Sequence, residues 1–423
     1  MSDTNRRAFL QATTAAAASV ALLPGAMAAG DDTLRVGLVG CGDRGTGAAK
    51  QALRADPKVK LVAMCDAFMD RLDSSLGNLK KIEDIAGKID VTPERKFDGF
   101  DGYKKLLECG VDVVLLTTPP GFRPIHLKAA IDAGKHVFCE KPVAVDVAGA
   151  KSVMETAKLA KQKNVSLCSG YCYRYDLAKR ETVKRIHDKA IGDISAMHVT
   201  YLTGPIWHRG SDPKWTPMEY QMRNWYYYTW LSGDFIVEQH CHNFDKANWV
   251  FGGKMPVAAT GVGGRQQRRD PKFGHIYDHF GATLEYADGA KLFSFCRQMP
   301  GCDGNVNDHV IGTRGSAQLM AHSITQAGGK EWEFGSETKV KDMYQVEHDE
   351  LFAGIRAGKL INDGENAAHS TLMAIMAREA AYTGKRLTWK QLMASNQNIA
   401  PAKYEWGAIE TPPVPTPGVY KFV

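Results

Sequence analysis

No apolar run in the sequence reaches the ~20 residues that a membrane-spanning helix needs, so we expect no stable membrane anchor. The nine cysteines are odd in number and scattered, which fits neither a disulfide framework nor paired zinc knuckles. Basic residues exceed acidic ones by only six, which argues against a nucleic-acid-binding protein, whose basic residues usually form a stripe. What remains is a globular composition, 44% apolar and 24% charged, over 423 residues, long enough for two or three domains.

The first thirty residues have the pattern of an export signal. Arg6 and Arg7 precede an alanine-rich stretch, and Ala26-Met27-Ala28 offers a cleavage site. This order of regions is typical of a twin-arginine signal peptide over residues 1–30, so we expect export by the twin-arginine machinery and cleavage after Ala28. The mature protein would then reside in the periplasm or outside the cell. That route exports folded proteins, which suits a protein that captures a cofactor in the cytoplasm; a disordered basic N-terminus is the alternative.

Strand and helix patterns alternate over residues 31–169. Near-continuous apolar runs predict strands at 34–39, 59–65, 111–116, 135–139 and 165–168. Helical patterns separate them at 45–55, 124–133 and 147–161. Buried strands joined by helices indicate a parallel sheet covered on both faces, and we therefore predict an α/β, doubly wound Rossmann domain.

A glycine-rich turn follows the first strand. Residues 40–45 read G-x-G-x-x-G, and Asp66 ends the next strand 21 residues after Gly45, close to the ~20 of a dinucleotide fingerprint. Gly40 permits the tight turn, Gly42 lets the backbone approach a pyrophosphate at the helix N-terminus, and Gly45 permits close packing of helix on strand. A glycine-rich turn in a nucleotide-free sheet is the alternative.

The residues around this turn bear on the choice of cofactor. Asp66 is placed to accept hydrogen bonds from the ribose hydroxyls and would repel a 2′-phosphate, which favours NAD. Arg44, next to Asp43 in the turn, could still hold a 2′-phosphate, so NADP stays possible.

Two further segments are expected at the same crevice, because ligands bind beyond the carboxyl ends of parallel strands. One is Thr117-Thr118-Pro119, with His126 on the following helix, and the other is Glu140-Lys141-Pro142. A lysine beside a cationic nicotinamide would have its ammonium form disfavoured, and Lys141 could then exchange a proton with a substrate hydroxyl. A surface lysine that closes a turn is the alternative.

Together these segments resemble the Gfo/Idh/MocA family, the glucose–fructose oxidoreductase and inositol dehydrogenase group. The resemblance rests on GCGDRG (40–45), TTPP (117–120) and HVFCEKPVA (136–144), and continues in GTRGSAQL (312–319) and residues 347–359 and 365–385. It implies a second α/β domain over 170–410 with a large, mostly antiparallel open sheet for substrate binding and oligomerisation as a homodimer or homotetramer. It further implies that Lys141 contacts the substrate oxygen and that a cis bond precedes Pro142. The proline-rich residues 411–423 are expected to form an extended arm.

Residues 233–245 resemble the family's second-domain helix motif. On a helix, Glu238, His242 and Asp245 are spaced by four and three residues and share one face. The resemblance makes His242 the catalytic histidine, places Glu238 at the usual aspartate position, and puts His240 where glycine is common. His242 would act as general base, since the reference pKa of histidine is ~6.5. Ordinary hydrogen-bonded histidines are one alternative; a metal set with Glu238 and distant histidines is another, although no compact metal motif supports it.

Substrate contacts are expected from four side chains: Tyr173, Arg174, His240 and Asp245. Tyr173 and Arg174 directly follow the last parallel strand, on the crevice side; a surface ion pair is the alternative for Arg174. The tryptophan-rich residues 206–230 suit stacking on sugar rings or, equally, packing of a lid.

The sequence therefore predicts an exported NAD(P)-dependent oxidoreductase that acts on a sugar, a glycoside or a cyclic polyol. Because a periplasm-like compartment offers no free nicotinamide pool, we expect the cofactor to be tightly bound and recycled. Glycoside cleavage through transient oxidation is one alternative, and a non-catalytic sugar-binding protein is another.

Overall fold

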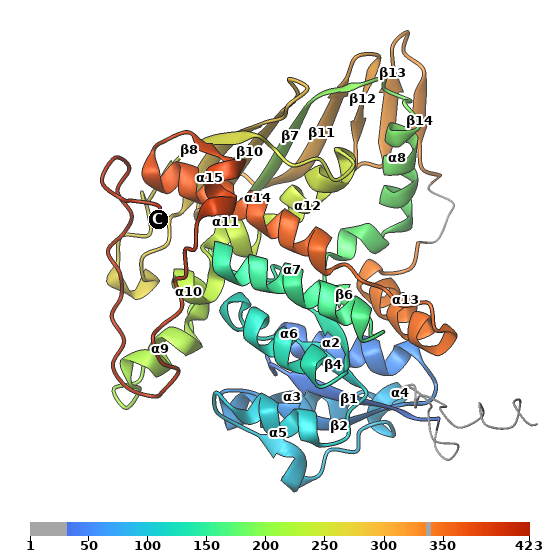
Figure 1. Ribbon diagram of the computed structural model, residues 1–423, viewed down its shortest axis with the longest axis vertical. Helices are drawn as coiled ribbons and strands as arrows, with labels where there is room; N and C mark the ends of the chain where they lie inside the picture. Colours follow the sequence, from blue (N-terminus) through green and yellow to red (C-terminus); the bar gives the residue numbers. More distant parts are fainter. Residues whose placement is uncertain (1–31, 336–339) are drawn as a thin grey trace, which may run out of the picture. The chain divides into compact units, whose positions relative to one another are not determined.

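The computed structural model describes residues 32–335 and 340–423 (Figure 1). The expected twin-arginine signal, residues 1–30, lies outside the described residues. Within the described ranges, no helix is both long and apolar enough to cross a membrane.

The first sheet has six parallel strands in the order β3-β2-β1-β4-β5-β6. The strands are β1 (Leu34–Val39), β2 (Val59–Cys65), β3 (Lys96–Phe97), β4 (Val113–Leu116), β5 (His136–Cys139) and β6 (Leu167–Ser169). Neighbouring strand residues face opposite layers: Leu115 packs in one core and Leu116 in the other. The sheet is therefore buried on both sides, as parallel sheets require, and the predicted Rossmann fold is confirmed.

Helices from both ends of the chain cover this sheet. One core contains side chains of α2 (Asp43–Ala55), α3 (Met69–Lys80) and the late helix α13 (Met343–Ala357). The other contains side chains of α5 (Gly102–Glu108), α6 (Arg123–Asp132) and α7 (Val147–Gln162). The short α4 (Glu83–Ala86) follows α3. Helix α13 thus covers the first sheet although it lies far along the sequence.

The second sheet has nine strands in the order β14-β13-β12-β11-β7-β10-β9-β8-β15. Its neighbours are antiparallel except β7 and β10, so the predicted mostly antiparallel sheet is confirmed. The strands are β7 (Ile194–Thr203), β8 (Ala258–Gly264), β9 (His279–Glu285), β10 (Lys291–Gln298), β11 (Asn305–Gly312), β12 (Gly315–Gln318), β13 (Ser323–Gln326), β14 (Glu331–Glu333) and β15 (Leu387–Thr388).

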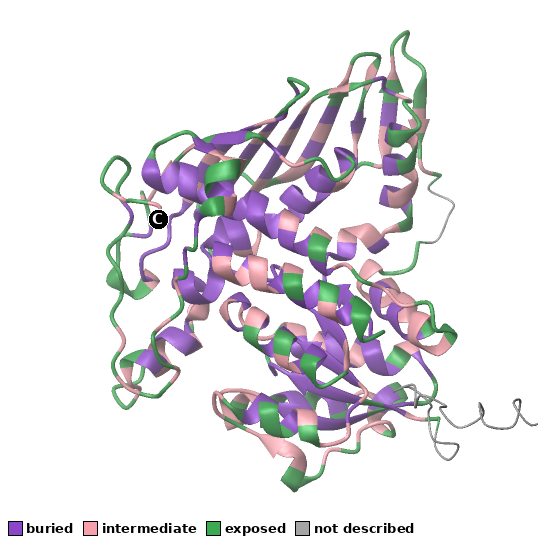
Figure 2. Cartoon of the chain, in the orientation of Figure 1, coloured by how far each residue is buried: buried purple, intermediate pink, exposed green. Residues whose placement is uncertain are grey.

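Most side chains of helix α14 (Gly364–Thr383) are buried (Figure 2), in the same core as those of α5, α6 and α7, which continues beneath the second sheet. Helix α14 packs against β8 and β9 of the second sheet and against α7 of the Rossmann domain. Its Arg378, almost fully buried, donates to the carbonyls of Val145 at 2.8 Å and Gly233 at 2.9 Å. One guanidinium therefore ties the chain that follows β5 to the start of the second-domain segment that carries the predicted catalytic residues.

The remaining helices belong to the second domain: α8 (Leu177–His187), α9 (Pro217–Arg223), α10 (Thr229–Ser232), α11 (Phe235–Glu238), α12 (Cys241–Val250) and α15 (Trp389–Ala394). The expected arm, residues 411–423, contains neither helix nor strand. It lies against the second domain, where the Pro415 carbonyl accepts from the Tyr277 hydroxyl at 2.6 Å and the Gly418 N–H donates to Thr383 at 3.0 Å.

Candidate active site and dinucleotide site

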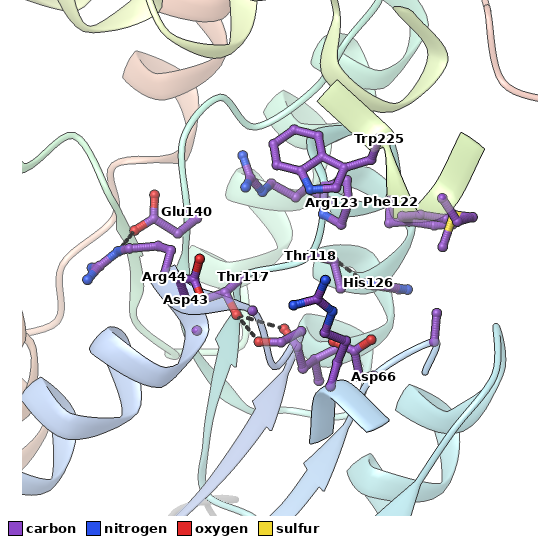
Figure 3. A pocket seen from close by; sticks show the side chains of 18 of the residues that line it. Asp43, Arg44, Asp66, Thr117, Thr118, Phe122, Arg123, His126, Glu140 and Trp225 are labelled. Atoms are coloured by element: carbon purple, nitrogen blue, oxygen red, sulfur yellow. Dashed lines mark hydrogen bonds and ion pairs between the residues drawn. The ribbon is translucent and has the colours of Figure 1, made fainter. Parts of the chain in front are cut away.

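A cavity of about 440 Å³ lies beyond the carboxyl ends of the first sheet's strands and is lined by both domains (Figure 3). Its size is ordinary for a ligand pocket. Every residue predicted to bind the cofactor lines it: Gly40, Gly42, Asp43, Arg44, Gly45, Asp66, Thr117, Thr118, Pro119, His126, Glu140 and Lys141. So do the predicted catalytic residues Glu238 and His242.

The three glycines of the turn differ in what surrounds them. Gly40 has a φ of +97°, and a side chain there would meet the Thr118 backbone at 2.6 Å. A Cβ at Gly45 would lie 1.9 Å from the Gly40 carbonyl oxygen. A Cβ at Gly42 would meet nothing within 4 Å, and its backbone is extended. The protein's own packing therefore requires Gly40 and Gly45, whereas Gly42 keeps space open at the N-terminus of α2, where a pyrophosphate fits.

Asp66 is fixed by the backbone around it. Its carboxylate accepts from the N–H of Cys41 at 2.6 Å and of Phe68 at 3.0 Å, at the end of β2. Burial raises the pKa of this carboxyl despite these bonds. The side chain lies where the fingerprint places the ribose-binding acid.

Arg44 points away from Asp66, toward buried carboxylates (Figure 3). Its guanidinium bonds Glu140 and, at 3.0 Å, Glu347 on α13. Although burial opposes it, Arg44 holds the pKa of Glu140 below its usual range, while burial and Glu140 raise that of Glu347. A guanidinium engaged in this way does not serve a 2′-phosphate, so its suggested role in NADP binding is not supported.

Lys141 joins the two domains inside the cavity. The peptide bond to Pro142 is cis, as the resemblance implied. The Lys141 ammonium donates to the Glu238 backbone carbonyl at 2.7 Å and to the Glu238 carboxylate at 3.0 Å. Burial alone would lower the pKa of Lys141, but the Glu238 charge outweighs it and raises the pKa. The chain by itself therefore favours the ammonium form; the opposing effect expected from a bound nicotinamide stays a prediction.

The predicted single helix through residues 233–245 is wrong. Helix α11 ends at Glu238 and α12 begins at Cys241. In a continuous helix the Glu238 carbonyl would accept from the His242 N–H; here it accepts from Lys141, and the His242 N–H donates to Gln239 at 3.4 Å. Consequently Glu238 and His242 face the cavity, whereas Asp245 does not line it.

His242 is a buried, neutral imidazole. Burial and the nearby cations Lys141, Lys246 and Arg44 lower its pKa well below the ordinary value. Its Nδ1 is buried and has no hydrogen-bond partner among the described residues. The cavity therefore brings together an ammonium that can donate a proton and a neutral imidazole that can accept one, although this imidazole is a weaker base than the reference pKa of ~6.5 implied.

None of the four predicted substrate contacts lines the cavity, and their role toward a substrate stays a prediction. Arg174 forms a forked ion pair with the buried Asp245, at 2.8 and 2.9 Å. The Tyr173 ring packs edge-on against His242, 5.2 Å between centroids. His240 is fully buried and bonds the Ser294 hydroxyl at 2.7 Å. The polar groups of Arg174, Asp245 and His240 are therefore engaged within the protein, and the Tyr173 ring supports His242 by packing.

The alternative of a metal site also finds no support. Within residues 32–335 and 340–423, no three His, Cys, Asp or Glu side chains are arranged to hold a metal ion. His275 bonds Thr229 and His279 bonds Asp278, away from the cavity that His242 lines.

Several cavity residues were not singled out from the sequence. Among them are Arg71, Tyr201, Arg209 and Gln239. Gln239 directly follows Glu238, and Arg71 lies five residues after Asp66, so proximity to known motifs was the only available signal. Of the tryptophan-rich segment, Trp207 and Trp225 line the cavity.

Fold and site define a dinucleotide-binding oxidoreductase. Residues 34–170 match the oxidoreductase family model with an NAD-binding Rossmann fold, and residues 180–318 match the GFO/IDH/MocA C-terminal domain. The chain belongs to the Gfo/Idh/MocA oxidoreductase family, and the predicted NAD-binding domain is confirmed.

Two curated proteins show what the chain is similar to in sequence. Inositol 2-dehydrogenase of Rhizobium meliloti is 25% identical over 290 residues, 67% of this chain and 74% of that protein. Glycosyl hydrolase family 109 protein 2 of Shewanella is 32% identical over 197 residues, 42% of this chain and 41% of that protein.

Solved structures share the fold at lower identity. An aldose-aldose oxidoreductase of Caulobacter crescentus, complexed with glycerol, has a TM-score of 0.63 and 20% identity over 84% of this chain and 99% of that chain. GenD2 from gentamicin A biosynthesis, in complex with NAD, has a TM-score of 0.62 and 19% identity over 84% and 96%.

Substitution by serine is expected to have opposite effects on stability at Gly42 and at Gly45. Gly42→Ser should fold at least as stably as the parent, because serine is a favoured N-cap, yet weaken NAD binding at least about tenfold, or about 1.4 kcal/mol. Gly45→Ser should lose stability by about 1–3 kcal/mol or more through the clash with Gly40. Urea unfolding and equilibrium dialysis with NAD measure the two effects; unchanged NAD binding by Gly42→Ser would contradict the pyrophosphate position.

Proposed function

We propose that the protein is an NAD-dependent oxidoreductase that acts on the CH–OH group of a sugar, a glycoside or a cyclic polyol. The observation that carries this proposal is the meeting of Lys141, Glu238 and His242 in the cavity that also contains the glycine-rich turn. The inositol dehydrogenase relatives support the substrate class.

The side chains divide the acid–base work. NAD, when bound, supplies a hydride acceptor. Gly42 would hold its pyrophosphate and Asp66 its ribose. Thr117, Thr118 and Glu140 line the same cavity as Lys141. The Lys141 ammonium, oriented by Glu238, donates a hydrogen bond to the substrate oxygen, which orients the carbinol. The neutral His242 accepts the hydroxyl proton as the hydride leaves the carbinol carbon. In a variant of this mechanism the two residues exchange roles: Lys141 accepts the hydroxyl proton, and His242 donates the hydrogen bond to the substrate oxygen.

The aromatic side chains of the cavity suit a ring-shaped polar substrate. Trp207 and Trp225 lie 5.9 Å apart between ring centroids and line the cavity together with Tyr201. Such rings present flat apolar faces on which the C–H side of a sugar or cyclitol stacks, while Gln239 offers hydrogen bonds to hydroxyls.

Substitutions at the two proton-handling residues test this mechanism. Lys141→Ala and His242→Ala should each lower kcat by about 10²–10⁴-fold while NAD binding stays near that of the parent. Absorbance of reduced nicotinamide, followed over a panel of inositols and aldoses, measures turnover. His369→Asn, which changes an imidazole outside the cavity, is the matched control. Parental turnover by both alanine variants would contradict the assignment.

Glycoside cleavage through transient oxidation is the second candidate. The glycosyl hydrolase family 109 relatives favour it. Oxidation of one carbinol acidifies the neighbouring C–H, so the glycosidic group would leave by elimination, water would add across the resulting double bond, and return of the hydride would restore the carbinol. In that reaction the reduced nicotinamide does not accumulate and the released sugar is not oxidised.

Net redox change separates the two candidates. A dehydrogenase produces one reduced nicotinamide or one reduced second substrate per oxidised product, whereas the hydrolase releases a free sugar with no net change. Product analysis of aryl glycosides and free polyols by mass spectrometry therefore decides between them. Release of the aryl group without any oxidised product would favour cleavage.

Export remains a proposal that rests on the sequence. We infer that the folded protein, loaded with a tightly bound NAD, leaves the cytoplasm by the twin-arginine route and works as a homodimer or homotetramer. Replacement of Arg6 and Arg7 by lysine should retain it in the cytoplasm, as cell fractionation would show. Unchanged export of that variant would contradict the signal.

A further inference from the structure

Residues 204–228 of the second domain, here named the bridging segment, carry two arginines that reach the Rossmann domain. Arg209 forms an ion pair with Asp43 on α2 at 3.3 Å. Arg223 pairs with Asp70 on α3 at 3.1 Å, and its guanidinium lies 4.0 Å from the centroid of the Phe68 ring. Both arginines line the cavity. The bridging segment therefore closes one side of the dinucleotide site.

Asp43 poses an electrostatic problem at this site. It is the first residue of α2 and follows Gly42, where the pyrophosphate is expected. A carboxylate at a helix N-terminus is favourable in the free chain, but it repels a diphosphate at the same helix end. The neighbouring cation, Arg44, is held by Glu140 and Glu347. The Asp43 side chain is 90% exposed, so water screens its charge in the free chain, and the cation paired with it is Arg209.

Arg209 is positioned to neutralise the charge of the Asp43 carboxylate. Its backbone N–H donates to the buried Asn224 side chain at 2.8 Å, and Asn224 donates in turn to the Gly210 carbonyl at 3.1 Å. Its guanidinium lies 4.6 Å from the centroid of the Trp207 ring. The side chain is thus anchored at both ends, yet one third of it is exposed. A guanidinium has five N–H donors, so the single contact with Asp43 leaves others for a phosphate.

We propose that Arg209 completes the dinucleotide site from the second domain by bridging Asp43 and the cofactor diphosphate. The contact neutralises Asp43 when the cofactor is bound and slows cofactor release. Tight binding of the cofactor then depends on Arg209, a residue outside the Rossmann domain. This inference rests on the proposed NAD-dependent function.

The rate of NADH release tests the proposed contact of Arg209 with the cofactor, and the measurement needs no substrate. NADH is preloaded, excess NAD is added in a stopped-flow instrument, and energy transfer from the cavity tryptophans to NADH reports release. Arg209→Gln should raise the release rate about tenfold or more, because a charge-assisted bond to phosphate is lost. Lys214→Gln removes a charge from the same segment outside the cavity and should change release less than about twofold, the effect of a distant exposed charge.

A second substitution distinguishes a contact of Arg209 with the cofactor diphosphate from an ordinary surface ion pair between Arg209 and Asp43. Asp43→Asn removes the repulsion, so its release rate should equal or fall below the parent's. Arg209→Gln should then have a smaller effect in the Asp43→Asn background, because no uncompensated carboxylate remains. Parental release by Arg209→Gln, in a protein that binds NADH, would overturn the inference and leave the proposed function standing. Absence of NADH binding by the parent would instead overturn the proposed function.

Discussion

The contact between Lys141 and Glu238 is the constraint on which the active site depends. It joins a Rossmann-domain loop to a second-domain helix end, 97 residues further along the chain. The Glu238 carbonyl accepts from Lys141 instead of from the His242 N–H; α11 ends there, α12 begins at Cys241, and His242 lines the cavity. The Glu238 carboxylate also keeps Lys141 charged in a buried place. One interaction thus connects the segments that carry both proton-handling groups and sets the charge of one.

Other buried polar groups hold the two domains in the arrangement that this contact needs. Arg378 of α14 bonds carbonyls from both domains, and Glu347 of α13 takes hold of Arg44 in the glycine-rich turn. Such groups are costly to bury unless they are paired, so these pairings specify one arrangement. The cofactor turn and the catalytic residues are therefore positioned by the second domain as much as by the first.

The sequence was sufficient for features that local patterns determine. Apolar runs located the first sheet's main strands, and the glycine turn with Asp66 located the cofactor end of the cavity. The two-residue β3 was missed because Lys96-Phe97 has no apolar run. The helix break at Glu238 was missed because the partner of the Glu238 carbonyl, Lys141, is remote in sequence. Arg174 was predicted at the substrate from its position after the last parallel strand and Asp245 from the helix motif; their pairing with each other is visible only in the fold. Arg209 carried no local signal.

The transfer of hydrogen from substrate to bound cofactor is the most direct test of the account. The folded protein is incubated with a cyclic polyol deuterated at its carbinol carbons and then denatured, and the released nucleotide is weighed by mass spectrometry. The account predicts NADH that carries one deuterium in the parent, and unlabelled NAD in Lys141→Ala and His242→Ala. Bound nucleotide that stays unlabelled in the parent with every polyol and sugar offered would contradict it.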